Sequence, residues 1–179
     1  MNETNGRLLG DGWRIAGWCS AAALLALPAI AMVLTDEVDW TLGDFAFAAG
    51  LVSISGLAME LSLRSARSWP RLIGLAIATF TASFTVWANL AVGILGDEGN
   101  PVNQLFFAAL CVGLLGAAIQ RFRSRPLARI AAALAIGQFA IGIIAAAEAT
   151  RPYVEWGALT LFAVLWSVAA LCLARDAQR

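Results

Sequence analysis

The chain has 179 residues, of which 60% are hydrophobic and 13% are charged, and its 12 basic residues balance its 12 acidic ones. Soluble domains are about 45–50% apolar and about 25% charged, so this composition indicates a membrane protein. The sequence contains no histidine and no lysine. This excludes a histidine-ligated haem or zinc, a Ser-His-Asp triad, a lysine Schiff base and a phosphate-binding P-loop. The cysteines Cys19, Cys111 and Cys172 are isolated in apolar stretches. We expect packing residues there and no cofactor.

Apolar stretches divide the chain into segments that are each long enough to cross a bilayer, which takes about 20 residues. They predict an all-α integral membrane bundle of six transmembrane helices in a single transmembrane domain, residues 1–179. The predicted helices cover about 13–34, 41–63, 71–96, 102–120, 127–150 and 157–174. An alternative for the first is a cleaved secretory signal peptide with Ala29-Ile30-Ala31 as the cleavage site. Because the apolar run continues to Leu34, a full span, the helix is favoured.

An acidic turn, residues 35–40, separates the first two predicted helices. Thr41 and Asp44 after it have the spacing of a capping box, in which each side chain binds the other residue's backbone N–H. Glu60 precedes Arg64 by four residues, which predicts an ion pair on one helix face.

The third predicted helix has the most polar interior. Thr81, Thr85 and Asn89 recur every four residues and therefore share one face. Gln138, near the centre of the fifth helix, lies at a depth similar to that of Thr85. These interior polar residues have two interpretations: a polar cluster in a transporter-like bundle, or helix-to-helix hydrogen bonds worth about 0.6 kcal/mol each.

Small residues and acidic turns suggest how the helices pair. Ala109, Gly113 and Ala117 are spaced by four and predict a close contact between the fourth helix and a neighbour. The turns around Asp36-Glu37 and Asp97-Glu98 are each followed by a similar apolar string. A further hypothesis is therefore that the chain is a repeat of three helical hairpins.

Arginine in short loops is retained on the cytoplasmic side. All the arginines except Arg151 fall near the chain termini or in the turns after the second and fourth predicted helices. The acidic turns fall on the opposite side. The sequence therefore predicts that both termini are cytoplasmic.

Two strings resemble a family of small, uncharacterised bacterial inner-membrane proteins. The first is Thr35-Asp36-Glu37-Val38-Asp39-Trp40. The second runs from Asn89-Leu90-Ala91-Val92-Gly93-Ile94 to Asn100-Pro101-Val102-Asn103. In that family the strings read T-D-E-V-N-W and N-L-A-V-G-I-I-G-x-E-D-N-P-A-N. The resemblance covers nearly the whole chain and implies a bacterial inner membrane, but no activity. Asp39 and Gly99 depart from the pattern, which weakens any role for those two positions.

Three functions remain open from the sequence. The first is a non-enzymatic membrane protein, either a transporter-like bundle or an accessory subunit, with Thr85, Asn89 and Gln138 as interior polar residues. The second is a cation-binding sensor or assembly factor. It would bind a divalent cation such as Ca²⁺ or Mg²⁺ through outer acidic residues and the Asn100 and Asn103 oxygens. The candidate carboxylates are Asp36, Glu37, Asp97 and Glu98.

The third function is an enzyme at the membrane surface, which would need a carboxylate pair such as Asp36 with Asp97. The main expected partner is the lipid bilayer. A homo-oligomer and a partner membrane protein both stay open, and no nucleic-acid partner is expected.

Overall fold

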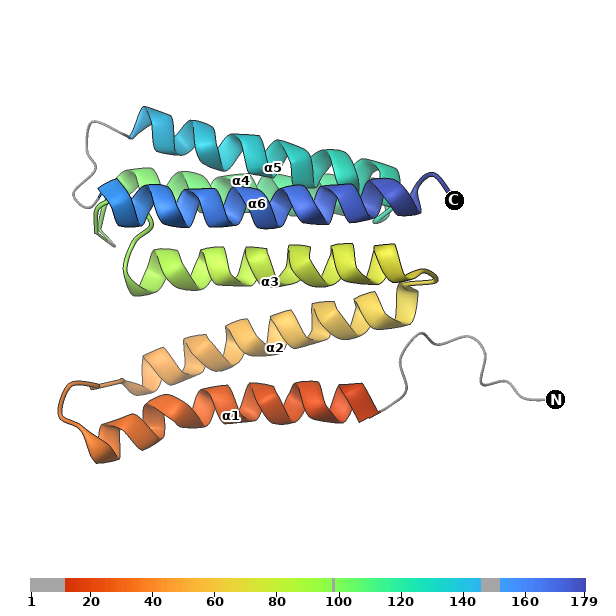
Figure 1. Cartoon of the computed structure of the whole chain (residues 1–179). Coiled ribbons are helices and arrows are strands. Elements are labelled where there is room, and N and C mark those ends of the chain that lie inside the picture. The colour runs from red at the N-terminus through yellow and green to blue at the C-terminus, as the bar shows by residue number, and fades with distance from the viewer. Residues whose placement is uncertain (1–11, 98, 146–151) are drawn as a thin grey trace. The chain divides into compact units, whose positions relative to one another are not determined.

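A computed structural model describes residues 12–97, 99–145 and 152–179 of the chain, and over these residues the protein is helical with no strand (Figure 1). Within these described residues, six helices are long and apolar enough to cross a membrane. The predicted fold class is therefore confirmed: the protein is an all-helical, multi-pass membrane protein. The helices fall into two compact units, Met1–Arg67 and Ser68–Arg179.

The first unit is a helical hairpin of α1 (Gly12–Leu34) and α2 (Leu42–Ser65). The predicted capping box begins α2: the Asp44 N–H donates to Thr41 Oγ1, and the Thr41 N–H donates to Asp44 Oδ2 at 2.8 Å. No residue of α1 is buried, and Ser62 is the buried residue of α2. The described part of this hairpin therefore has little core of its own.

The two helices of the hairpin meet at two places along their length. A Cβ added to Gly56 would lie 2.9 Å from the Trp18 ring, so glycine lets α1 and α2 approach there. Nearby, Glu60 forms the predicted ion pair with Arg64, at 2.5 Å. The same carboxylate also binds Arg14 and the Trp18 indole N–H from α1. Glu60 therefore ties the two helices together as well as its own turn, which the sequence spacing did not indicate.

The second unit contains α3 (Trp69–Ala91), a short 3-10 helix η2 (Pro101–Asn103), α4 (Gln104–Ile119), α5 (Ser124–Ile144) and α6 (Pro152–Asp176). Helix α6 packs along both α3 and α5, and α4 packs along α5 (Figure 1). We name the two ends of this unit by their residues. The acidic end holds the α3–α4 loop with Asp97 and the start of α6 with Glu155. The basic end holds Arg71, the α4–α5 turn and Arg175.

Two apolar clusters form the core of the second unit. The first, toward the acidic end, includes Phe106, Leu159 and Phe162, and the second includes Leu134 and Trp166. Lipid is as apolar as these side chains, so close packing of helices rather than exclusion of water must stabilise the core. Small residues allow that packing. The predicted contact of α4 is confirmed, because Gly113 faces Ile130 and Leu134 of α5.

Several predicted helix boundaries were wrong. The third helix was expected to reach residue 96, but α3 ends at Ala91, because Gly93 and Gly96 adopt left-handed φ angles of 70° and 72° that favour glycine. The fourth helix is preceded by the 3-10 turn that starts at Pro101. Helices α5 and α6 begin earlier than expected, at Ser124 and Pro152. The expected residues 146–150 of the fifth helix lie outside the described residues.

Candidate functional site

The interior polar residues of α3 form a ladder along one buried face, as predicted. Thr81 and Thr85 are 0% exposed and Asn89 is 2% exposed. Thr81 Oγ1 donates to the Ile77 carbonyl at 2.7 Å, and Thr85 Oγ1 donates to the Thr81 carbonyl at 2.8 Å. Asn89 Nδ2 donates to the Thr85 carbonyl at 2.9 Å. Each donor is therefore satisfied by the preceding turn of its own helix and needs no other helix.

Gln138 of α5 is also 0% exposed, and neither its amide nitrogen nor its amide oxygen has a hydrogen-bond partner within the described residues. The same holds for Asn89 Oδ1 and for Trp166 Nε1 of α6. In sequence, Gln138 stands between Leu134 of one apolar cluster and Ile141 of the other. A buried unsatisfied polar group costs about 1–3 kcal/mol. Thr85, Asn89 and Gln138 are thus buried, but the described contacts include no hydrogen bond between Thr85 and Gln138, so the two interpretations, a polar cluster or helix-to-helix hydrogen bonds, stay predictions.

The acidic end is built around Asn103, which is 3% exposed. Its Oδ1 accepts the Leu95 N–H at 3.0 Å, and its Nδ2 donates to the carbonyls of Leu95 and Asp97, at 3.1 and 2.7 Å. The side chain thus pairs with the loop backbone on both its donor and its acceptor side. As a result the loop turns inward, and Ile94 and Leu95 are 4% and 3% exposed.

Glu155 fixes the same loop from α6. Its carboxylate is 4% exposed and Oε1 accepts the Gly96 N–H at 3.2 Å. Glu155 was not among the site residues predicted from the sequence. Glu155 and Gly96 are 59 positions apart in the sequence, so no short-range spacing of residues indicates their contact. The one available signal was an acidic residue in the first turn of a helix, where the helix dipole favours a carboxylate.

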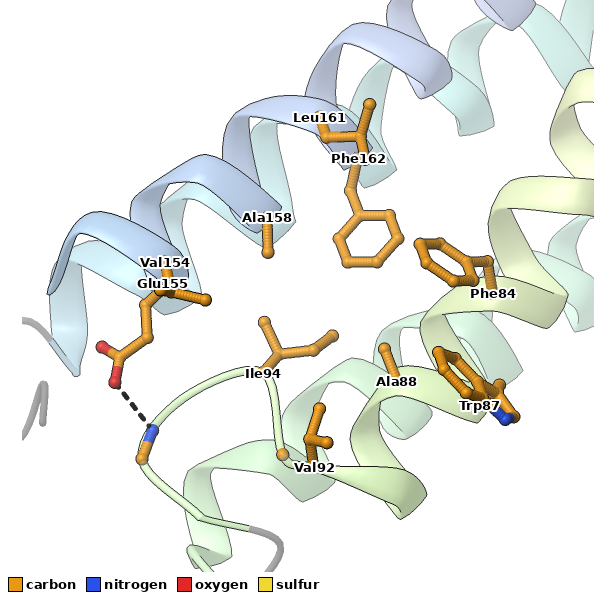
Figure 2. Close-up of a pocket in the computed structure, with 12 residues that line it drawn as sticks. Phe84, Trp87, Ala88, Val92, Ile94, Val154, Glu155, Ala158, Leu161 and Phe162 are labelled. Atoms are coloured by element: carbon orange, nitrogen blue, oxygen red, sulfur yellow. Dashed lines mark hydrogen bonds between the residues drawn. The ribbon is translucent and has the colours of Figure 1, made fainter. Parts of the chain in front are cut away.

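A pocket of about 180 Å³ lies between this loop, α3 and the first half of α6 (Figure 2). Phe84 and Phe162 face each other at one side, with ring centroids 5.6 Å apart, and Glu155 stands at the other (Figure 2). Ile94 lies between them, while Trp87 and Val92 at the rim are 44% and 53% exposed. The lining is apolar apart from Glu155. None of Thr85, Asn89 and Gln138 contributes to it.

The carboxylates proposed for a divalent cation are spread over both units. Asp36 and Glu37 are exposed residues of the first unit, and Asp97 is an exposed residue of the second. Glu98 lies outside the described residues. Among the residues that the structure describes, no group of three or more acidic or cysteine side chains is arranged to hold a metal ion. The two amide oxygens predicted to assist cation binding already accept hydrogen bonds: Asn100 Oδ1 accepts the Val102 N–H at 3.0 Å, and Asn103 Oδ1 accepts the Leu95 N–H. The cation site and the Asp36–Asp97 pair therefore stay predictions.

At the basic end, a polar cluster joins three segments that are distant in sequence. Arg71 of α3 lies 3.8 Å from the Asp176 carboxylate of α6, and it donates to the Phe122 carbonyl at 2.9 Å. Ser124, which starts α5, accepts from Arg71 and donates to Asp176 at 2.5 Å. Ser68, the N-cap of α3, also donates to Asp176. This cluster clamps the ends of α3, α5 and α6.

Comparison of the chain with models of protein families, with curated proteins and with solved structures gave no match.

Proposed function

We propose that the protein is a non-enzymatic membrane protein that acts as an accessory subunit and not as a transporter. The observation that carries the proposal is the position of the interior polar residues. Thr85, Asn89 and Gln138 are buried in a packed core, and none of them lines the pocket between α3 and α6. A carrier needs polar groups that face a path for its substrate, and such groups mark substrate pathways in membrane proteins. Here the polar atoms face packed side chains.

The hairpin of the first unit supports a role in association. Its α1 has no buried residue, and large apolar side chains such as Leu27 and Ile54 are 58% and 68% exposed. Helices associate in membranes through close packing at small residues. Gly17 and Gly50 have no atom within 4 Å of where a Cβ would be, so these positions leave room for another helix. We propose that this hairpin is the surface that contacts a partner membrane protein or a second copy of the chain.

The proposed location is a bacterial inner membrane with both chain termini in the cytoplasm. It is supported by the arginine distribution and by the family resemblance of the acidic-turn strings. A C-terminal fluorescent reporter should be active in the cytoplasm, and a reporter that works only in the periplasm should be silent there. The opposite pattern would reverse the orientation.

Photo-crosslinking tests the accessory role. A photoreactive amino acid at position 27 or 54 should give a discrete protein adduct after irradiation of intact cells. The same residue at position 136, where Ile136 of α5 is 72% exposed, is the matched control and should give lipid adducts. Lipid adducts alone at all three positions would contradict the proposal.

A further inference from the structure

The α4–α5 turn carries a patch of unpaired positive charge, which we name the basic turn: Arg121, Arg123, Arg125 and Arg129. All four side chains are exposed, and the sequence from 120 to 130 contains no acidic residue. Within the described residues none of the four forms an ion pair, whereas Arg14, Arg64 and Arg71 each pair with a carboxylate. Asp176, the acid that contacts this turn through Ser124, is already engaged by Arg71. No carboxylate of the described residues therefore pairs with the arginines of the basic turn.

The backbone of the basic turn is held in place. Arg121 and Phe122 both have φ of 52°, a left-handed conformation that is unfavourable for residues with a side chain. Backbone N–H groups of both residues donate to carbonyls of α4, at 2.9 and 2.8 Å, and Arg71 binds the Phe122 carbonyl. Such conformations persist where the surroundings determine them, and they occur often at binding sites. This one fixes the direction of the chain between Arg121 and Arg123.

Two further features of the turn suit an anion at a membrane surface. Phe122 is 45% exposed between two of the arginines, at the point where two membrane-crossing helices end. Helix α5 starts there without a side-chain cap, because its N-cap residue is Arg123, whose guanidinium has no acceptor for a backbone N–H. The N-terminal N–H groups of a helix favour negative charge. Arg125 and Arg129, four residues apart on α5, extend the same charge along one helix face.

We propose that the basic turn is a binding site for the phosphate headgroup of an anionic phospholipid, with Phe122 entering the boundary between headgroups and acyl chains. Arginine clusters directly beside a membrane-crossing helix attract anionic lipids, and apolar side chains such as phenylalanine insert at the boundary between headgroups and acyl chains. The exposed Phe122 is the reason to assign a lipid rather than a soluble phosphate, which offers no apolar contact.

Lipid binding to the purified chain in a neutral detergent tests the proposal. Fluorescent phosphatidylglycerol should bind, and phosphatidylcholine should bind far more weakly. Each arginine near an anionic surface contributes about fivefold in affinity. Arg123→Gln/Arg125→Gln should therefore weaken phosphatidylglycerol binding by more than tenfold, at about two arginine contributions. Phe122→Ser should weaken it as well.

The matched control is Arg64→Gln/Arg67→Gln, which removes two charges from the other arginine turn of the chain and should weaken phosphatidylglycerol binding less than Arg123→Gln/Arg125→Gln does. If the first double variant misfolds, as judged by its unfolding temperature without lipid, Arg121→Gln/Arg129→Gln replaces it. Equal binding of the two lipids, or equal losses in the Arg123/Arg125 and Arg64/Arg67 variants, would overturn the proposal. So would displacement of the lipid by inorganic phosphate at the same concentration, which would indicate a free-phosphate site.

Discussion

Asn103 offers the sharpest test of how the acidic end is held together. Replacing it with alanine removes three hydrogen bonds, to Leu95 N–H, Leu95 carbonyl and Asp97 carbonyl. At about 0.5–1.5 kcal/mol for each bond, the loss for three bonds is about 1.5–4.5 kcal/mol in the free energy of unfolding. The buried Leu95 groups would lose their partners, which places the effect in the upper part of that range. Asn100→Ala removes one bond, to the Val102 N–H, and should cost about 1 kcal/mol.

Unfolding by a denaturing detergent in mixed micelles gives the required free energies. Asn103→Leu separates hydrogen bonding from volume, because leucine fills a similar space but supplies no polar atom. We expect Asn103→Leu to lose about as much as Asn103→Ala, since both leave the loop backbone unpaired. The reasoning would be refuted if Asn103→Leu matched the native protein, or if Asn103→Ala lost no more than Asn100→Ala.

Three further predictions test packing, the polar cluster and the cation hypothesis. Gly74→Ala should lower the free energy of unfolding by about 1–3 kcal/mol, because its Cβ would lie 2.8 Å from Leu173 Cγ and 3.2 Å from the Ala169 carbonyl. Gly137→Ala, whose Cβ would have no atom within 4 Å, should be neutral or stabilising. Equal losses of unfolding free energy in the two variants would contradict this packing. Asp176→Ala should lower the free energy of unfolding by about 1–3 kcal/mol, because it removes the carboxylate that pairs with Arg71 and accepts hydrogen bonds from two serines. Arg179→Ala, at an exposed position, should cost less than about 0.5 kcal/mol. If the carboxylates of the acidic turns bind a cation, millimolar Ca²⁺ or Mg²⁺ should raise the unfolding temperature in a concentration-dependent way. The double variant Asp36→Asn/Asp97→Asn should abolish this rise. An unchanged unfolding temperature in the native protein would contradict the cation hypothesis.

Local sequence patterns were sufficient for the helices and for contacts within one turn. Apolar length predicted the six helices of the described residues that are long and apolar enough to cross a membrane. Residue spacing predicted the Thr41–Asp44 capping box and the Glu60–Arg64 pair. The burial of Gln138 also followed from its place in an apolar helix. These features depend on residues three or four apart, or on the composition of one segment.

Contacts between distant segments could not be predicted in this way. The hydrophobicity of residues 92–96 suggested a continuation of the third helix, but the loop turns inward and is fixed by Asn103 and Glu155. Asp176 lies beyond the predicted end of the sixth helix at residue 174, and it accepts hydrogen bonds from Ser68 and Ser124, which are 108 and 52 positions away in the sequence. In each case the deciding hydrogen bond joins two elements whose proximity follows only from the tertiary packing.

The closed polar interior, on which the accessory role depends, is tested most directly by thiol labelling. The native residues Cys19, Cys111 and Cys172 are first replaced by alanine, and a single cysteine is then introduced at position 138. The variant is labelled in membrane vesicles of both orientations. A charged, water-soluble reagent modifies a thiol only where the thiol is in contact with water and can ionise to the thiolate. We predict that Gln138→Cys reacts as slowly as Leu134→Cys in the neighbouring apolar cluster. A rate close to that of Asp36→Cys in the exposed acidic turn would contradict the closed interior and would favour a transport path instead.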